Sequence, residues 1–227
     1  MHIPKPDIVY RPSGEVEDML MINAMPRKAA AALRALSLDP SITDVEMRLK
    51  EVFIFDNRDP GKGDIYLVTV VADNLSVEPF TIEIKAFEDI HDNEALQLGP
   101  AGLTIYRNPQ GQIPRFLDYR ILVMESDQEM RQAGDVLNEI RNNDQFKVVR
   151  DNLIAMAATA QPTVALITAA SDLVIGLIAQ ILKMNRDDQI IYVAGSFNDK
   201  IDDLGVKYGL IAHKNAYARL AYQVLAA

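Results

Sequence analysis

The sequence predicts a mainly β protein, an antiparallel β-sandwich that carries an inserted helical block. Over residues 46 to 127, short runs rich in β-branched and aromatic residues alternate in polarity and are separated by Gly, Pro, Asn and Asp. Over residues 128 to 185, apolar residues instead recur at helical spacing. Strand-like runs return over residues 186 to 227, so the last strands are expected to complete the first sheets and the helices to form an insertion.

Residues 1 to 45 are predicted to be an N-terminal extension of a single domain that spans residues 1 to 227. The extension includes one short helix, PRKAAAALRALSL, at residues 26 to 38. Pro26 suits the first turn of a helix, where an N–H group would have no partner, and alanine has the highest helix propensity. The rest of the extension is expected to be irregular.

The strands of the sandwich are predicted from their alternation and composition. In chain order the first segment contains VEMRLKEVFIF, DIYLVTVVAD, VEPFTIEIKAFED, GLTIYRN and FLDYRILVMES, and the second contains QIIYVAGSF and AYARLAYQVL. β-Branched and aromatic side chains fit a pleated, half-buried surface, which is why they are enriched in strands. Together these runs predict two packed antiparallel sheets.

The helical block is predicted to contain three helices. The apolar spacing covers residues 130 to 140 in the first and 146 to 157 in the second, which Pro162 ends because proline disfavours helix just before it. The third helix, TVALITAASDLVIGLIAQILK at residues 163 to 183, approaches the length of a bilayer span. Asp172 near its centre would be costly in lipid. A core helix with one wetted edge is therefore the favoured interpretation, and a membrane-inserting or self-associating helix is the alternative.

The composition limits the classes of function. The chain has 227 residues and a formal net charge of −9, which disfavours the clustered Lys and Arg that general nucleic-acid binding requires. It contains no cysteine, which excludes disulfides, thiolate metal sites and cysteine nucleophiles. The first residues lack the basic region and apolar run of a signal peptide, so a cytoplasmic location is the default expectation.

The most unusual local sequence is FDNRDPGKGDIYLVTV, residues 55 to 70, where carboxylates crowd around two glycines just before a strand. This segment resembles the first calcium loop of the synaptotagmin-type C-two domain. Asp56 stands at the early acid of that loop and Asp64 at the acid that opens the next strand. Gly63 and Ile65 stand where the family pattern has Ser and Pro.

A second segment, RILVMESDQEMRQAGDVL, resembles the other half of that family's site. The resemblance covers about residues 49 to 134 and implies a β-sandwich that binds calcium and lipid. Calcium takes about six to eight oxygen ligands. The candidate ligands are Asp56, Asp59, Asp64, Glu125 and Asp127, provided that their loops meet at one end of the sandwich. The alternative is a plain connecting loop, because Asp, Asn, Pro and Gly all favour turns.

A further acidic cluster contains Asp199, Asp202 and Asp203, in a segment that reads as a long loop from Asn198 to Gly205. A solvated loop is the simpler interpretation, since these residue types favour turns. The cluster would join the acidic loop at residues 55 to 70 only if both lie at the same end of the sandwich.

The sequence favours a non-catalytic binding module. It contains no HExxH helix, P-loop, dinucleotide-binding fingerprint or nucleophile elbow, so no catalytic residue is assigned. By analogy with the C-two family, the loops and the helical block are expected to contact a membrane or a protein partner, with calcium optional. One alternative is a structural protein whose apolar helices form an assembly interface in a homo-oligomer. The other is a carboxylate- or metal-dependent hydrolase with paired acids in a deep pocket.

Overall fold

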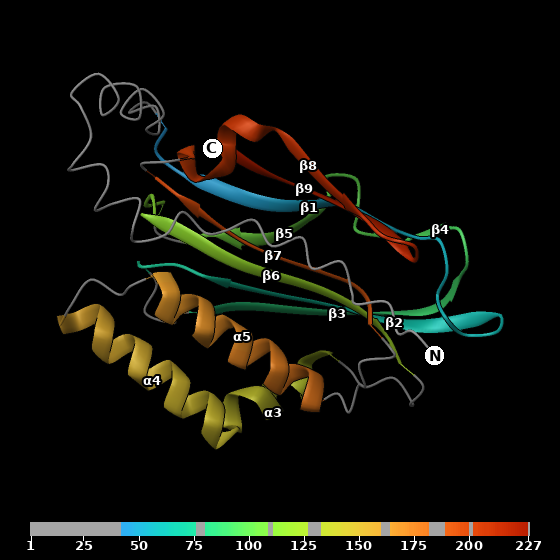
Figure 1. The fold of residues 1–227 in the computed structure, drawn as a ribbon, viewed down its shortest axis with the longest axis horizontal. Helices are drawn as coiled ribbons and strands as arrows, with labels where there is room; N and C mark the ends of the chain where they lie inside the picture. The colour runs from blue at the N-terminus through green and yellow to red at the C-terminus, as the bar shows by residue number, and fades with distance from the viewer. Residues whose placement is uncertain are drawn as a thin grey trace.

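The fold is a sandwich of two antiparallel β-sheets, with three helices laid over the outer face of one sheet (Figure 1). This computed structural model describes residues 42–75, 80–108, 111–126, 133–159, 164–181, 189–199 and 202–226. The predicted fold class, an antiparallel sandwich with an inserted helical block, is confirmed. The predicted helix at residues 26 to 38 and the candidate ligand Asp127 lie outside the described residues.

Sheet A joins the first described strand to the last. Its strands are β1 (Val45–Ile54), β4 (Glu94–Ala95), β5 (Leu103–Arg107), β8 (Leu210–Lys214) and β9 (Ala218–Ala226). The strand order is β4-β1-β9-β8, and β5 also pairs with β1. The pairing of β1 with β9 runs from Val45 opposite Ala226 to Ile54 opposite Ala218. The final strand therefore completes the first sheet, as the sequence predicts.

Sheet B carries the helical block. Its strands are β2 (Lys62–Ala72), β3 (Phe80–His91), β6 (Phe116–Glu125) and β7 (Gln189–Asn198), in the order β3-β2-β6-β7. The helices α3 (Ala133–Asn142), α4 (Asp144–Thr159) and α5 (Val164–Ile181) follow β6. Because β7 then pairs directly with β6, the helical block is an excursion between two neighbouring strands.

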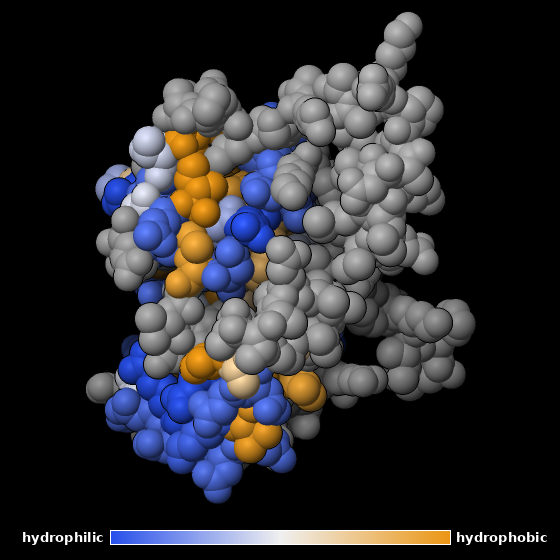
Figure 2. Space-filling model, turned by 90° about the vertical axis from the view of Figure 1, so that its left-hand side faces the viewer, coloured by the Kyte–Doolittle hydropathy of each residue, from blue (hydrophilic) through white to orange (hydrophobic). Residues whose placement is uncertain are grey.

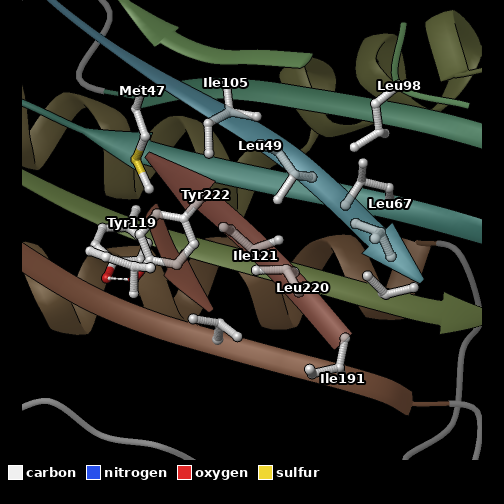
Figure 3. Packing of buried hydrophobic residues seen from close by; sticks show 14 of the residues in the cluster. Met47, Leu49, Leu67, Leu98, Ile105, Tyr119, Ile121, Ile191, Leu220 and Tyr222 are labelled. Atoms are coloured by element: carbon white, nitrogen blue, oxygen red, sulfur yellow. Dashed lines mark hydrogen bonds between the residues drawn. The ribbon is translucent and has the colours of Figure 1, made fainter. Parts of the chain in front are cut away.

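The main core lies between the two sheets. Alternate residues of each strand point inwards, so Met47 of sheet A belongs to the same buried cluster as Leu67 and Ile121 of sheet B (Figure 3). Tyr119 and Tyr222 meet inside this core, and their hydroxyl oxygens lie 2.5 Å apart in a hydrogen bond between the sheets (Figure 3). The buried hydroxyls thus satisfy each other.

A second core lies between sheet B and the helices. Val174 and Ile178 of α5 pack in one buried cluster with Val68 of β2 and Leu122 of β6. All ten residues of β6 are buried, because this strand is covered on both faces. The interpretation of the third predicted helix as a core helix is therefore confirmed. Within the described ranges, no helix has the length and apolar character needed to cross a membrane.

The described part of the helical block presents a mainly polar surface in the side view of Figure 2. Figure 2 shows this block in the lower part of the view as largely hydrophilic, with separate hydrophobic residues. Val148 of α4 and Leu173 of α5 are the most exposed large apolar side chains of the described helices. Scattered side chains of this kind are normal on a protein surface and do not by themselves indicate an interface.

Three elements differ from the sequence prediction. The segment predicted as a long loop after β7 contains the 3-10 helix η2 (Asp203–Tyr208), and strands β4 and β8 are absent from the prediction. β8, LIAHK, lacks the β-branched and aromatic enrichment that predicts β5, a strand of the same length. Its pairing with β9, from Leu210 opposite Gln223 to Lys214 opposite Arg219, is what makes it a strand.

Candidate functional site

The acidic loop lies at one end of the sandwich, which we call the loop end. The loop end comprises residues 55–64, 88–92, 125–126 and 214–219. The amides of Phe55 and Asp56 donate to the carbonyl of Tyr217 at 2.7 and 3.1 Å. The amide of Ser126 donates to the carbonyl of Asp64 at 2.8 Å. These bonds join the loop after β1 to the β8–β9 turn, and the start of β2 to the end of β6.

Asn57 organises the acidic loop from inside. Its side chain is fully buried, and Nδ2 donates to the carbonyls of Gly61 at 3.2 Å and Ile90 at 2.8 Å. Its Oδ1 accepts the amide of Asp59 at 3.0 Å, and its own amide donates to the Asp92 carboxylate at 2.9 Å. Hydrogen bonds within the protein therefore account for the shape of the loop.

Three of the predicted calcium ligands lie on this loop or just after it. Asp56 is exposed, and its carboxylate accepts the amide of Arg58 at 2.8 Å. The carboxylate of Asp64 accepts the amide of Asp89, a residue of the neighbouring strand, at 3.1 Å. Asp59 is half-buried. These contacts are typical of turn residues, and a carboxylate that accepts one hydrogen bond keeps acceptor capacity for a cation.

Glu125, the fourth predicted ligand, is the last residue of β6, where it pairs with Ile65 and is only 4% exposed. A Cβ atom added to Gly63 would lie 3.4 Å from Cγ of Glu125 and 3.3 Å from Nδ2 of Asn57. Gly63, which stands at the serine position of the C-two pattern, therefore leaves room for these two buried side chains. The structure thus brings Glu125 beside the acidic loop, as the predicted site requires.

The described part of the chain contains no group of three or more His, Asp or Glu side chains placed to hold a metal ion. Asp127, the fifth predicted ligand, lies outside that part. A calcium site at the loop end therefore stays a prediction, and any such site would need oxygen atoms beyond the described carboxylates.

A surface that the sequence analysis does not predict lies beside the acidic loop. Three cations lie over aromatic rings: Arg58 over Tyr217 at 4.8 Å, Lys214 over Phe55 at 4.7 Å and Arg219 over Phe53 at 5.7 Å from the ring centroid. We call these six residues the cation–aromatic surface. The cations are exposed and the rings are half-buried. The surface therefore offers positive charge and apolar contact together.

The helix-covered face of sheet B holds a second polar cluster. Arg120 is 2% exposed; its Nη1 donates to Asp118 at 2.8 Å, and its Nε donates to Asp172 of α5 at 2.7 Å. The hydroxyl of Tyr192 donates to Asp172 at 3.4 Å. Burial alone would lower the pKa of Arg120, but the two carboxylates outweigh it and raise that pKa. The cluster fixes α5 on the sheet, and its charges are matched inside the protein.

The acidic cluster after β7 lies at the opposite end of sheet B from the acidic loop. β6 and β7 pair with Phe116 opposite Asn198, so Asp202 is a strand's length away from Glu125 at the other end of β6. The carboxylate of Asp202 accepts the amide of Asn198 at 2.6 Å. Burial raises the pKa of Asp202 to about 6. The two acidic clusters therefore do not form one site.

Sequence reasoning misses Arg120 and the cation–aromatic surface, although each leaves a signal. Arg120 is the single cation in the mainly apolar strand β6, two residues from Asp118 and so on the same face. Phe53 and Phe55 are likewise two residues apart. Phe53 lies in β1, and Phe55 comes just after that strand. Their cations come from the β8–β9 hairpin, far along the chain, and no local pattern reveals that contact.

Comparison with known proteins adds no family to these observations. A scan against protein-family models finds no match to the chain, and a search of curated proteins finds none either. The likeness to the C-two domain therefore rests on the motif residues of the two acidic segments and on the sandwich architecture.

Proposed function

We propose that the protein is a non-catalytic, C-two-like binding module whose loop end contacts the surface of an anionic membrane or protein partner. The observation that carries the proposal is the cation–aromatic surface. It places Lys214 and Arg219 on aromatic rings, exposed to solvent, in a chain whose net charge is −9. Arg219 also forms an ion pair with Glu51, so the positive charge that this surface offers to an anionic partner rests mainly on Lys214 and Arg58.

An anionic membrane is the partner class that this surface fits best. Aromatic rings favour the boundary between headgroups and acyl chains, and nearby cations add attraction to anionic lipids. Phe53 and Phe55 pack with their ring centroids 5.3 Å apart, which places two apolar groups between the cations. An acidic protein surface is the second partner class and would use the same cations.

Calcium is optional in this proposal. The acidic loop lies beside the cation–aromatic surface, and Asp56 near the start of the loop is exposed. A bound cation would remove the repulsion between these carboxylates and an anionic membrane. The cations of the surface supply attraction whether or not a metal is present.

Co-sedimentation with vesicles tests the membrane contact. The protein is mixed with vesicles of phosphatidylcholine alone, or with added phosphatidylserine, in EGTA and in calcium. We expect binding to the anionic vesicles, lost in Lys214→Glu and kept in Lys147→Glu, an equal charge reversal on the exposed surface of α4. Binding only in calcium would add the metal site, and Asp64→Asn should then remove that dependence.

Absence of binding to phosphatidylserine vesicles in both conditions would overturn the membrane contact. Equal loss of binding in Lys214→Glu and Lys147→Glu would also overturn it, because general charge would then explain the attraction. Circular dichroism spectra of both variants check that each one keeps its fold.

A further inference from the structure

Arg58 is held at both its backbone and its side chain. Its φ of 71° lies in the left-handed region, which is uncommon for residues other than glycine, and its amide donates to the carboxylate of Asp56 at 2.8 Å. Its Nη1 donates to the carbonyl of Gln189 at 3.1 Å, and its guanidinium lies 4.8 Å from the ring centroid of Tyr217. Three segments that are distant in the sequence therefore fix the position of this side chain.

Asn57 stabilises the backbone that carries Arg58. Its fully buried side chain accepts the amide of Asp59 and donates to the carbonyls of Gly61 and Ile90. The turn at Arg58 is therefore formed by contacts within the chain and does not need a partner to shape it. An arginine that is positioned in advance loses little side-chain freedom when it binds.

The edge of the Arg58 guanidinium formed by Nε and Nη2 donates to no acceptor in the described part of the chain. An arginine can donate from these two atoms together to two oxygen atoms of one anion. Arg48 uses the same edge to bind both carboxylate oxygens of Glu46, at 2.8 and 3.0 Å. Arg58 is exposed, and its side chain donates through Nη1. Its Nε–Nη2 edge is therefore available to an oxyanion from outside the chain.

The surroundings of Arg58 make geometry more important there than charge. Asp56 and Asp59 flank Arg58 closely in the chain, so an approaching anion meets repulsion as well as attraction. Lys214, which lies over Phe55, is a point charge that attracts an anion without fixing its orientation. A guanidinium instead binds two oxygen atoms in one plane. The two cations are therefore suited to different tasks.

We propose that Arg58 is the specificity-determining residue of the loop end, and that its Nε–Nη2 edge binds two oxygen atoms of an anionic lipid headgroup. This role of Arg58 rests on the membrane contact proposed above, and it adds the residue that recognises the headgroup. The oxyanion is a phosphate or a carboxylate, since both present two oxygen atoms to the paired donors. Lys214 supplies general attraction, and Arg58 supplies recognition.

Vesicle co-sedimentation of Arg58→Lys in EGTA tests this role, because the change keeps the positive charge and removes the paired donors. We expect the affinity for phosphatidylserine vesicles to fall on the order of tenfold. Arg150→Lys is the matched control on α4, where Nε and Nη2 of Arg150 already donate to the carboxylate of Asp151 at 3.1 and 2.9 Å. It should bind as the wild type does. Circular dichroism spectra check the fold of both variants.

A second headgroup separates the two oxyanions. Phosphatidylglycerol carries the same net charge as phosphatidylserine, but its headgroup has a phosphate and no carboxylate. If Arg58→Lys loses affinity for both kinds of vesicle, the edge binds the phosphate. If the loss is confined to phosphatidylserine, the edge binds the carboxylate. Either result supports recognition of the headgroup by Arg58.

Nuclear magnetic resonance separates direct contact from an indirect effect on the loop. In the wild-type protein, the Nε–H signal of Arg58 should shift when short-chain phosphatidylserine is added. The corresponding signal of Arg150 should stay in place, because that edge is occupied by Asp151.

Two results would overturn this role of Arg58 and leave the membrane contact standing. One is an Arg58→Lys variant that binds phosphatidylserine vesicles as the wild type does, while Lys214→Glu does not. The other is an Arg58 Nε–H signal that the lipid does not move, although the wild-type protein binds the vesicles. A wild-type chain that binds no anionic vesicle would overturn the membrane contact itself, and the role of Arg58 with it.

Discussion

The outer faces of the two sheets carry the same kinds of charged residue in opposite surroundings. The three described helices all lie over sheet B (Figure 1), so Arg120 on that face is 2% exposed and is held between two carboxylates. On sheet A, Arg219 forms an ion pair with Glu51 in which both side chains remain well exposed. The covered face needs the charges of Arg120 matched inside the protein, whereas the Arg219–Glu51 pair of sheet A remains in contact with water.

This contrast shows how burial sets the energetic weight of an ion pair. A charge removed from water loses its hydration, and only a well-placed partner recovers it. An exposed pair gains little because water screens the attraction and the side chains lose freedom. Disrupting ion pairs on the two faces should therefore have very different effects on stability.

The strongest destabilisation is expected on the covered face. Arg120→Met removes the cation and leaves the carboxylate of Asp118, which is 1% exposed, buried without it. We expect a loss of about 3–5 kcal/mol in the free energy of unfolding. Urea unfolding followed by circular dichroism measures it.

The double variant Arg120→Met, Asp118→Leu is the matched control. Replacing a buried ion pair by apolar groups of similar volume is often neutral, so most of the lost stability should return. If Arg120→Met alone were as stable as the wild type, water would reach this face of sheet B, and the contrast between the two sheets would be weaker.

An intermediate effect is expected at Asp202, which is half-buried just after β7. Burial raises its pKa from 3.8 to about 6, so the folded protein holds this proton more tightly than the unfolded chain does. The stability contribution of Asp202 is therefore lost as the pH rises from about 4 to 6. The side chain introduced by Asp202→Asn cannot ionise, and its amide oxygen can still accept the Asn198 N–H.

We therefore expect Asp202→Asn to be more stable than the wild type above pH 6 by about 1–3 kcal/mol. The gain should disappear near pH 4, where the wild-type carboxyl is largely protonated in the folded protein and beginning to be protonated in the unfolded chain. Thermal unfolding of both proteins across this pH range measures it. A constant difference at every pH would show that Asp202 titrates normally.

The weakest effect is expected on the open face. Glu51→Gln removes one charge of the exposed pair with Arg219 and should change the free energy of unfolding by less than about 0.5 kcal/mol. Urea unfolding in low and high salt measures it. A loss as large as that of Arg120→Met would mean that sheet A is also covered in solution, for example by a partner.

The fold was predictable from the sequence where local patterns are strong. The alternation in β1 and the apolar runs of β2 and β6 predict strands, and the helical spacing after residue 128 predicts the insertion. β8 and η2 were not predictable in this way, because each is short and depends on contacts with β9 and β7. Long-range pairing can turn a weak local pattern into a defined element.

The candidate site was predictable only in part. The turn-forming residues of the acidic loop predict its bend, and Asp56, Asp64 and Glu125 do lie at one end of the sandwich. Asn57 reads as one more turn residue, yet it is the buried centre of the loop's hydrogen bonds. A sequence records that a residue can form turns and does not record which atoms will surround it.

Periodicity and composition are local properties of the chain, so they were enough to establish the sandwich, the place of the helical insertion and the absence of cysteine chemistry. Which charges are buried and which segments become neighbours emerged only from the folded arrangement. Folding set Asp172 of α5 against Arg120 of β6, and the cations of the β8–β9 hairpin on Phe53 and Phe55. These contacts join residues distant in sequence, so their energies depend on the packing of whole elements.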